Sequence, residues 1–130
     1  MPIHGLVIAY RKPDTTPTEF QNHYENNHVP ILQRLAGEDF FLSHQRFYLA
    51  RGEAIPAPAT VVLGDDQDFE YDALTIVTFK DQEHMNRFYA KIGTPEAKKE
   101  IEEDEARFLD RTRLKVILIG DVRKTVNESA

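Results

Sequence analysis

His28 is a titratable residue on the side of a helix that is expected to be buried. It falls within the apolar stripe of an expected helix over residues 16–37, and Pro30 follows it by two residues. Counting about 100° per residue places His28 roughly 80° from Phe20, on the side that faces a sheet. An imidazole titrates near neutrality, so in a pocket beside a proline-interrupted helix it can act as a general acid or base. The alternative is a histidine at the edge of the core that bonds a nearby carbonyl.

A carboxylate, Asp104, is the second unusual residue. Ala97, Ile101, Asp104 and Phe108 fall within about 60° of arc on a later helix, so Asp104 lies in the middle of an apolar face. A buried carboxylate must find donors or stay protonated. Asp104 is therefore either a structural acceptor for backbone donors or an arginine, or the group that orients His28.

Three polar side chains share one side of an expected strand over residues 40–50, namely His44, Arg46 and Tyr48. This pattern indicates either a wet cavity or an interface. An arginine that faces a cavity would suit a carboxylate or phenolate ligand. Two other histidines, His23 and His84, lie on expected helices and are expected to face solvent.

Composition excludes several classes of protein. The 130 residues contain 16 Lys plus Arg against 22 Asp plus Glu and no cysteine, so the formal charge is 16 − 22 = −6. We expect no nucleic-acid partner, no membrane partner, no disulfides and no thiolate metal site, in a soluble cytoplasmic protein. His23 and His28 are five residues apart, and no metal, nucleotide or nucleophilic-serine motif occurs. No metal and no cofactor are expected.

The elements follow from periodicity and capping signals. Helices are expected from Thr16 to Gly37, with a break near residues 27–29, and in two pieces that begin at Asp81 and Thr94. Strands are expected over residues 3–10, 40–50 and 71–80, and a buried strand over 114–122. Residues 51–70 read as a long loop, with some extended residues at 60–63. We expect one domain over residues 1–123 and a polar tail over 124–130.

This order, β-α-β-β-α-β, predicts an α+β protein of the ferredoxin-like class, with a four-stranded antiparallel sheet and helices on one face. The other sheet face would be apolar and uncovered in a monomer. We therefore expect a homodimer.

Two segments resemble the signatures of the EthD-type family of dimeric α+β barrel proteins. They are Glu19-Phe20-Gln21-Asn22-His23-Tyr24 followed by His28-Val29-Pro30, and Asp104-Glu105-Ala106-Arg107-Phe108-Leu109-Asp110. The resemblance covers roughly residues 3–122 and implies a protomer that dimerises through its sheet, with a pocket between sheet and helices. Relatives include decarboxylases, cyclases and cofactor-free oxygenases of aromatic polyketide tailoring. The long segment 51–70 resembles the fungal branch, which includes decarboxylases of anthrone-type acids.

The resulting functional hypothesis is a cofactor-independent lyase that decarboxylates an anthrone- or anthraquinone-type carboxylic acid. His28 would be the acid–base catalyst and Asp104 its partner. A small aromatic substrate would contact the remaining candidate residues: Phe20, Tyr24, His44, Arg46, Tyr48, Phe88 and Phe108. Alternatives are a polyketide cyclase or dehydratase, a cofactor-free oxygenase, or a non-enzymatic module that binds a small ligand or a haem through His28.

Overall fold

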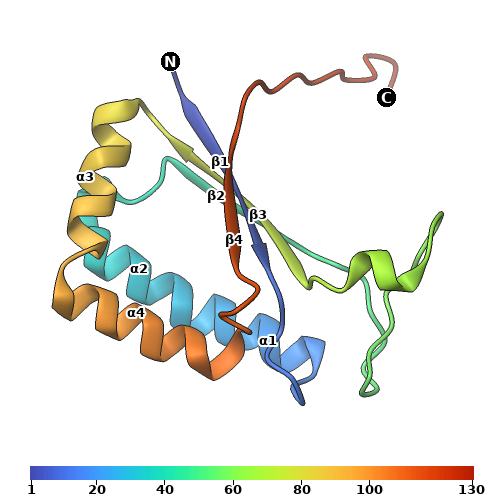
Figure 1. Cartoon of the computed structure of the whole chain (residues 1–130). Coiled ribbons are helices and arrows are strands. Elements are labelled where there is room, and N and C mark those ends of the chain that lie inside the picture. The colour runs from blue at the N-terminus through green and yellow to red at the C-terminus, as the bar shows by residue number, and fades with distance from the viewer.

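Four antiparallel strands form one sheet, and the computed structural model describes all 130 residues. The strands are β1 (Ile3–Ala9), β2 (Ser43–Tyr48), β3 (Ala73–Phe79) and β4 (Lys115–Ile119), in the spatial order β2-β3-β1-β4. The helices are α1 (Pro17–His23), α2 (Val29–Ala36), α3 (Gln82–Ile92) and α4 (Pro95–Phe108), all on one face of the sheet (Figure 1). The predicted ferredoxin-like α+β fold is confirmed. None of the helices is long and apolar enough to cross a membrane.

The chain enters the helical layer through the predicted capping box. The Thr16 hydroxyl accepts a hydrogen bond from the Glu19 N–H at 3.1 Å, and the Glu19 carboxylate accepts one from the Thr16 N–H at 3.0 Å. Pro17 occupies the first helical position, where its missing N–H costs nothing. These local signals set where α1 begins.

The predicted irregularity before Pro30 is a π-helical turn over Tyr24–His28, which joins α1 to α2. The Val29 N–H bonds the Tyr24 carbonyl across this wider turn. Because Pro30 has no N–H to give to the preceding turn, the wider turn accommodates it without breaking the helix. Tyr24 and His28 are both buried there, on the side that faces the sheet.

The central strand β3 alternates as predicted, with Ala73, Thr75, Val77 and Phe79 buried beneath the helices. Two clusters of buried apolar side chains fill the space between sheet and helices. One contains Phe20, Tyr24 and Phe108, and the other contains Val77, Phe79 and Phe88.

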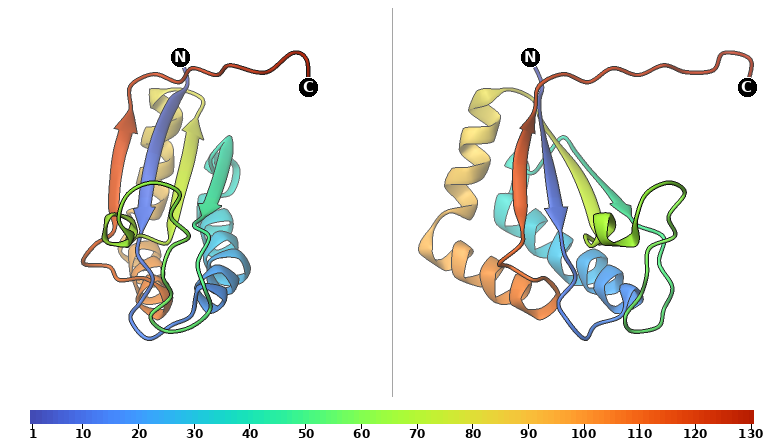
Figure 2. Two further views of the ribbon diagram at one scale, coloured as in Figure 1. Left: turned by 90° about the vertical axis from the view of Figure 1, so that its right-hand side faces the viewer. Right: turned by 45° about the vertical axis from the view of Figure 1, so that its right-hand side comes forward.

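The prediction of a buried last strand is wrong. In β4, Ile117 is 62% exposed and Leu118 is 61% exposed. The strand lies at the edge of the sheet, pairing only with β1, and none of the four α-helices lies on the opposite sheet face (Figure 2). Its apolar sequence therefore reflects an uncovered face rather than a buried position.

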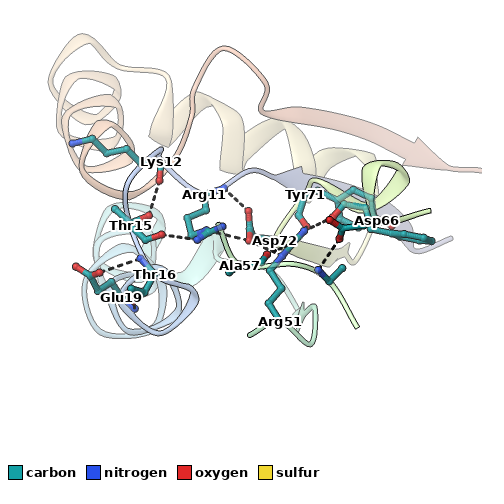
Figure 3. A network of polar contacts seen from close by, with 12 residues as sticks. Arg11, Lys12, Thr15, Thr16, Glu19, Arg51, Ala57, Asp66, Tyr71 and Asp72 are labelled. Carbon is teal, nitrogen blue, oxygen red and sulfur yellow. Dashed lines mark hydrogen bonds and ion pairs between the residues drawn. The ribbon is translucent and has the colours of Figure 1, made fainter. Parts of the chain in front are cut away.

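Residues 51–70 form the expected long loop, held by buried Arg51. Its guanidinium donates to the carbonyls of Ala57, Phe69 and Tyr71, and its Nε lies 3.0 Å from the Asp72 carboxylate (Figure 3). Residues 60–63 form no strand, because the loop pairs with itself only at the bridge between residues 51 and 59.

His84 is buried, which corrects the expectation that it faces solvent. Its Nδ1 accepts a hydrogen bond from the Lys80 N–H at 2.9 Å, and its Nε2 donates to the carbonyls of Asp39 and Phe40 at 3.0 Å each. The imidazole ties the start of α3 to the segment before β2. Its role is structural.

Candidate functional site

His28 and Asp104 form a buried pair that links the π-helical turn to α4. Their side chains meet between Nδ1 and Oδ2 at 3.0 Å, and the Asp104 side chain is 1% exposed. An ionised carboxylate only accepts hydrogen bonds, so His28 Nδ1 carries a proton. His28 Nε2 has no hydrogen-bond partner within the protein. Neither helix places this pair alone; the packing of α4 against the π-helical turn does.

His23 is a further residue of this polar cluster, and the sequence analysis misplaced it. It was expected to face solvent, yet its Nε2 lies 2.9 Å from Asp104 Oδ1, and its ring stacks on Phe108 with 4.7 Å between ring centroids. Arg107 Nη1 approaches the same oxygen at 3.7 Å. Asp104 thus uses one oxygen for each imidazole. The five-residue spacing of the two histidines was the available signal, since one π-helical turn brings such positions to the same side.

A cavity of about 150 Å³ lies between the sheet and the helices, and His28 is part of its wall. Fourteen of its 17 lining residues are hydrophobic. Tyr89 and Val116 line it and are 47% and 57% exposed, so the cavity opens between α3 and the edge strand β4. An apolar wall with a few polar groups is typical of a small-molecule site.

The structure brings four of the expected substrate-contacting residues to this cavity: Tyr24, His44, Phe88 and Phe108. Phe20 does not line it, because its ring is buried in the core against Tyr24, Tyr48 and Phe108. Asp104 does not line the cavity, but it contacts His28, which does.

Arg46 and Tyr48 do not line the cavity either, because both side chains bind Glu25. Arg46 grips this carboxylate with Nε at 2.5 Å and Nη2 at 2.9 Å, and the Tyr48 hydroxyl donates to it. The hydrogen bond from Arg46 lowers the pKa of Glu25. Burial and the Glu25 contact raise the pKa of Tyr48. On this face of β2, Arg46 and Tyr48 therefore bind Glu25 instead of lining the cavity.

The Tyr24 hydroxyl, which also lies at the cavity, is bonded to Thr75 at 3.0 Å. Burial raises the pKa of Tyr24. The phenol is therefore a neutral part of the wall. His28 lines the same cavity and can act as a base, and its other ring nitrogen is hydrogen-bonded to the Asp104 carboxylate.

Other ligands fit the site poorly. An apolar cavity near 150 Å³ accommodates about one benzene-sized ring, so a haem would require His28 and its neighbours to move apart. No cluster of three or more His, Asp or Glu side chains is arranged to hold a metal ion.

Several solved structures share this fold at low sequence identity. An ethyl tert-butyl ether D (EthD) family protein from Bacillus halodurans has 16% identity and a TM-score of 0.56, with 92% of this chain and 99% of that chain covered. SnoaB, a cofactor-independent oxygenase from Streptomyces nogalater, has 12% identity and a TM-score of 0.54, with 98% of each chain covered. A dimeric ferredoxin-like protein of unknown function from Thermobifida fusca has 10% identity and a TM-score of 0.52, with 92% and 90% covered.

Comparison by sequence adds the family. No curated protein matches the chain. The EthD domain model matches residues 12–112, which include the π-helical turn, β2, β3 and all of α4. The chain belongs to the EthD domain family.

Proposed function

We propose that this chain is a cofactor-independent enzyme in which His28, held by Asp104, is the acid–base catalyst. One observation carries the proposal: His28 Nδ1 donates a hydrogen bond to a buried carboxylate at 3.0 Å, while His28 Nε2 has no hydrogen-bond partner within the protein and the residue lines an apolar cavity. The carboxylate fixes the imidazole orientation and stabilises its charged form. A group so placed can deliver a proton to a substrate carbon, or remove one.

The reaction that we propose is decarboxylation of an aromatic polyketide acid of the anthrone or anthraquinone type. A dry cavity disfavours the charged carboxylate relative to carbon dioxide, and the His28 imidazolium supplies the proton that replaces the carboxyl group. The 14 hydrophobic lining residues support a site of this kind. The resemblance of the loop over residues 51–70 to the fungal branch of the EthD family supports the choice of polyketide tailoring.

The substrate enters with one ring in the cavity. About 150 Å³ takes one ring, so the remaining rings of a polycyclic substrate would project through the opening beside Tyr89 and Val116. Tyr89 is half-exposed and lines the cavity at this opening. We therefore expect one- and two-ring analogues to bind without rearrangement and three-ring acids to displace this side chain.

Oxygenation is the second candidate. It is favoured by the shared fold with SnoaB, which is a cofactor-independent oxygenase. In that reaction neutral His28 would remove a proton from an anthrone-type carbon and generate the carbanion that reacts with oxygen. The same base would also serve a cyclisation with loss of water.

We also propose that two copies pack through the uncovered sheet face. Apolar side chains form paired rows across it: Leu6 lies between Ile76 and Ile117, and Ile8 lies beside Leu74. In a lone protomer these apolar side chains would be exposed to water, which favours their burial against the same face of a second copy. The dimeric relative from Thermobifida fusca supports the assembly.

Mass spectrometry of incubated anthrone and anthraquinone carboxylic acids, with and without oxygen, tests the proposal. Loss of carbon dioxide, loss of water and gain of oxygen have different masses. We expect loss of carbon dioxide under both atmospheres and at least a hundred-fold lower rate in His28→Gln. Glu103→Gln is the control, because the Glu103 side chain is 60% exposed and contacts no histidine. An equal rate in folded His28→Gln would overturn the acid–base assignment.

A further inference from the structure

A second histidine, His44, lines the same cavity with the opposite hydrogen-bonding character. Its Nδ1 lies 3.0 Å from Arg46 Nη1. A guanidinium only donates hydrogen bonds, so His44 Nδ1 must accept and carry no proton. The neutral ring then has its proton on Nε2, the nitrogen that makes no hydrogen bond within the protein.

Arg46 is held in the pose that imposes this tautomer. Glu25 binds its Nε and Nη2, and its Nη1 also donates to the His44 carbonyl at 2.8 Å. Burial and the adjacent Arg46 charge lower the pKa of His44 to about 4. His28 acts in the same direction, and Glu25 opposes it. His44 is thus a neutral donor over the range in which enzymes work.

We propose that His44 Nε2–H is the hydrogen-bond donor that binds a substrate carbonyl or phenolic oxygen beside His28, and that this pair selects aromatic rings bearing such an oxygen. His28 presents a nitrogen that exchanges a proton, whereas His44 presents a nitrogen that only donates. The two rings belong to different elements, the π-helical turn and β2, and meet at one cavity. Arg46 acts only through His44 and is a positioning residue.

The role of His44 in decarboxylation follows from this assignment and rests on the proposed function. When the bond between the ring carbon and the carboxylate breaks, carbon dioxide leaves and the electron pair moves onto the neighbouring carbonyl as an enolate. The enolate oxygen accepts the His44 Nε2 hydrogen bond, and the His28 imidazolium gives its Nε2 proton to the carbon. Water later restores the His28 proton. A fixed donor aimed at developing negative charge stabilises the transition state, typically by about a hundred-fold or more in rate.

Nuclear magnetic resonance of the free protein tests the tautomer without any substrate. In protein labelled with ¹⁵N-histidine, we expect His44 to be protonated at Nε2 alone and to remain so from about pH 8 to about pH 5. His84 is an internal reference, since its Nδ1 accepts the Lys80 N–H. The His44→Phe spectrum assigns the signal. A proton on His44 Nδ1 anywhere in this range would overturn the inference.

A matched pair of ligands tests the selectivity. The aromatic ketone 1-tetralone and its parent hydrocarbon tetralin differ in the carbonyl oxygen, and both have one aromatic ring. We expect wild type to bind the ketone about 3- to 10-fold more tightly, the worth of one neutral hydrogen bond, and His44→Phe to lose this preference. His28→Gln should keep the preference. A ketone preference that survives in folded His44→Phe would refute the assignment.

The two proposals fail separately. If anthrone-type acids are not turned over while the His44-dependent ketone preference is present, the proposed reaction is wrong and the donor site stands. If turnover occurs at a wild-type rate in His44→Phe, the donor role is wrong and the His28 assignment stands.

Discussion

The substitution Asp104→Asn separates a catalytic from a structural role for the buried carboxylate. Asp104 accepts hydrogen bonds from two imidazoles, at 2.9 Å from His23 and 3.0 Å from His28. An amide of the same shape has one oxygen and one NH₂ group, so it can accept from only one of the two rings. The substitution also removes the negative charge beside His28.

The expected magnitude follows from these contacts. A hydrogen bond to a charged group contributes about 1.5–3 kcal/mol, which is roughly a 10- to 150-fold effect on the imidazolium form of His28. We expect the decarboxylation rate to fall by about that factor. Stability should change less, because the amide also avoids the cost of burying a charge at a site that is 1% exposed.

The assay is turnover of the anthrone-type acid together with thermal unfolding. Glu103→Gln is the matched control, a carboxylate on the same helix that is 60% exposed and contacts no histidine. Asp104→Leu should lower the free energy of unfolding by about 2 kcal/mol or more, because it leaves two imidazole N–H groups without an acceptor. A wild-type rate in Asp104→Asn, with a lowered melting temperature, would show that the carboxylate is structural.

Three further predictions concern assembly, pH dependence and the loop. Ile117→Lys places a charge on the uncovered face and should give monomers in sedimentation equilibrium. Leu118→Lys, on the opposite side of β4, should remain dimeric. Monomeric wild type would refute the sheet interface. Arg46 holds the folded pKa of Glu25 below its ordinary 4.5, so the ion pair stabilises the fold above that value and the stabilisation is lost as pH falls through the folded pKa. Glu25→Gln should therefore unfold at lower urea near pH 7, with a difference from wild type that shrinks around pH 3; a constant difference would contradict this sign. Arg51→Ala removes the bonds that hold residues 51–70 and should cost about 2–4 kcal/mol and expose that loop to proteases, whereas Arg123→Ala, 90% exposed, should do neither.

Much of the fold was predictable because its signals are local. The Thr16 capping box, the alternation along β3 and the proline in the first turn of α4 each depend on neighbours within a few residues, and each appears in the structure as expected. The apolar run of β4 was different. Its β-branched composition correctly indicated a strand, but the depth of a strand depends on what covers it, and that is decided by the sheet order.

The candidate site was also predictable only in part. Periodicity alone placed His28 and Asp104 on the inner faces of two helices, because an amphipathic helix states which side is buried. It could not give the 3.0 Å contact between them, which joins residues 76 positions apart. It also misplaced His23, since the π-helical turn after it shifts the angular count that assumes 3.6 residues per turn.

The sequence therefore determined the element types, the ferredoxin-like order and the two candidate catalytic residues, because hydrophobic period and capping are properties of short segments. The tertiary structure decided which side chains meet. It placed two imidazoles on one carboxylate and brought His28 and His44 to one cavity. It also placed Arg46, which was expected to bind a ligand, in a hydrogen bond to His44. Contacts of this kind join segments that are far apart in the chain, and they depend on helix packing and strand register to within an ångström, which no local pattern encodes.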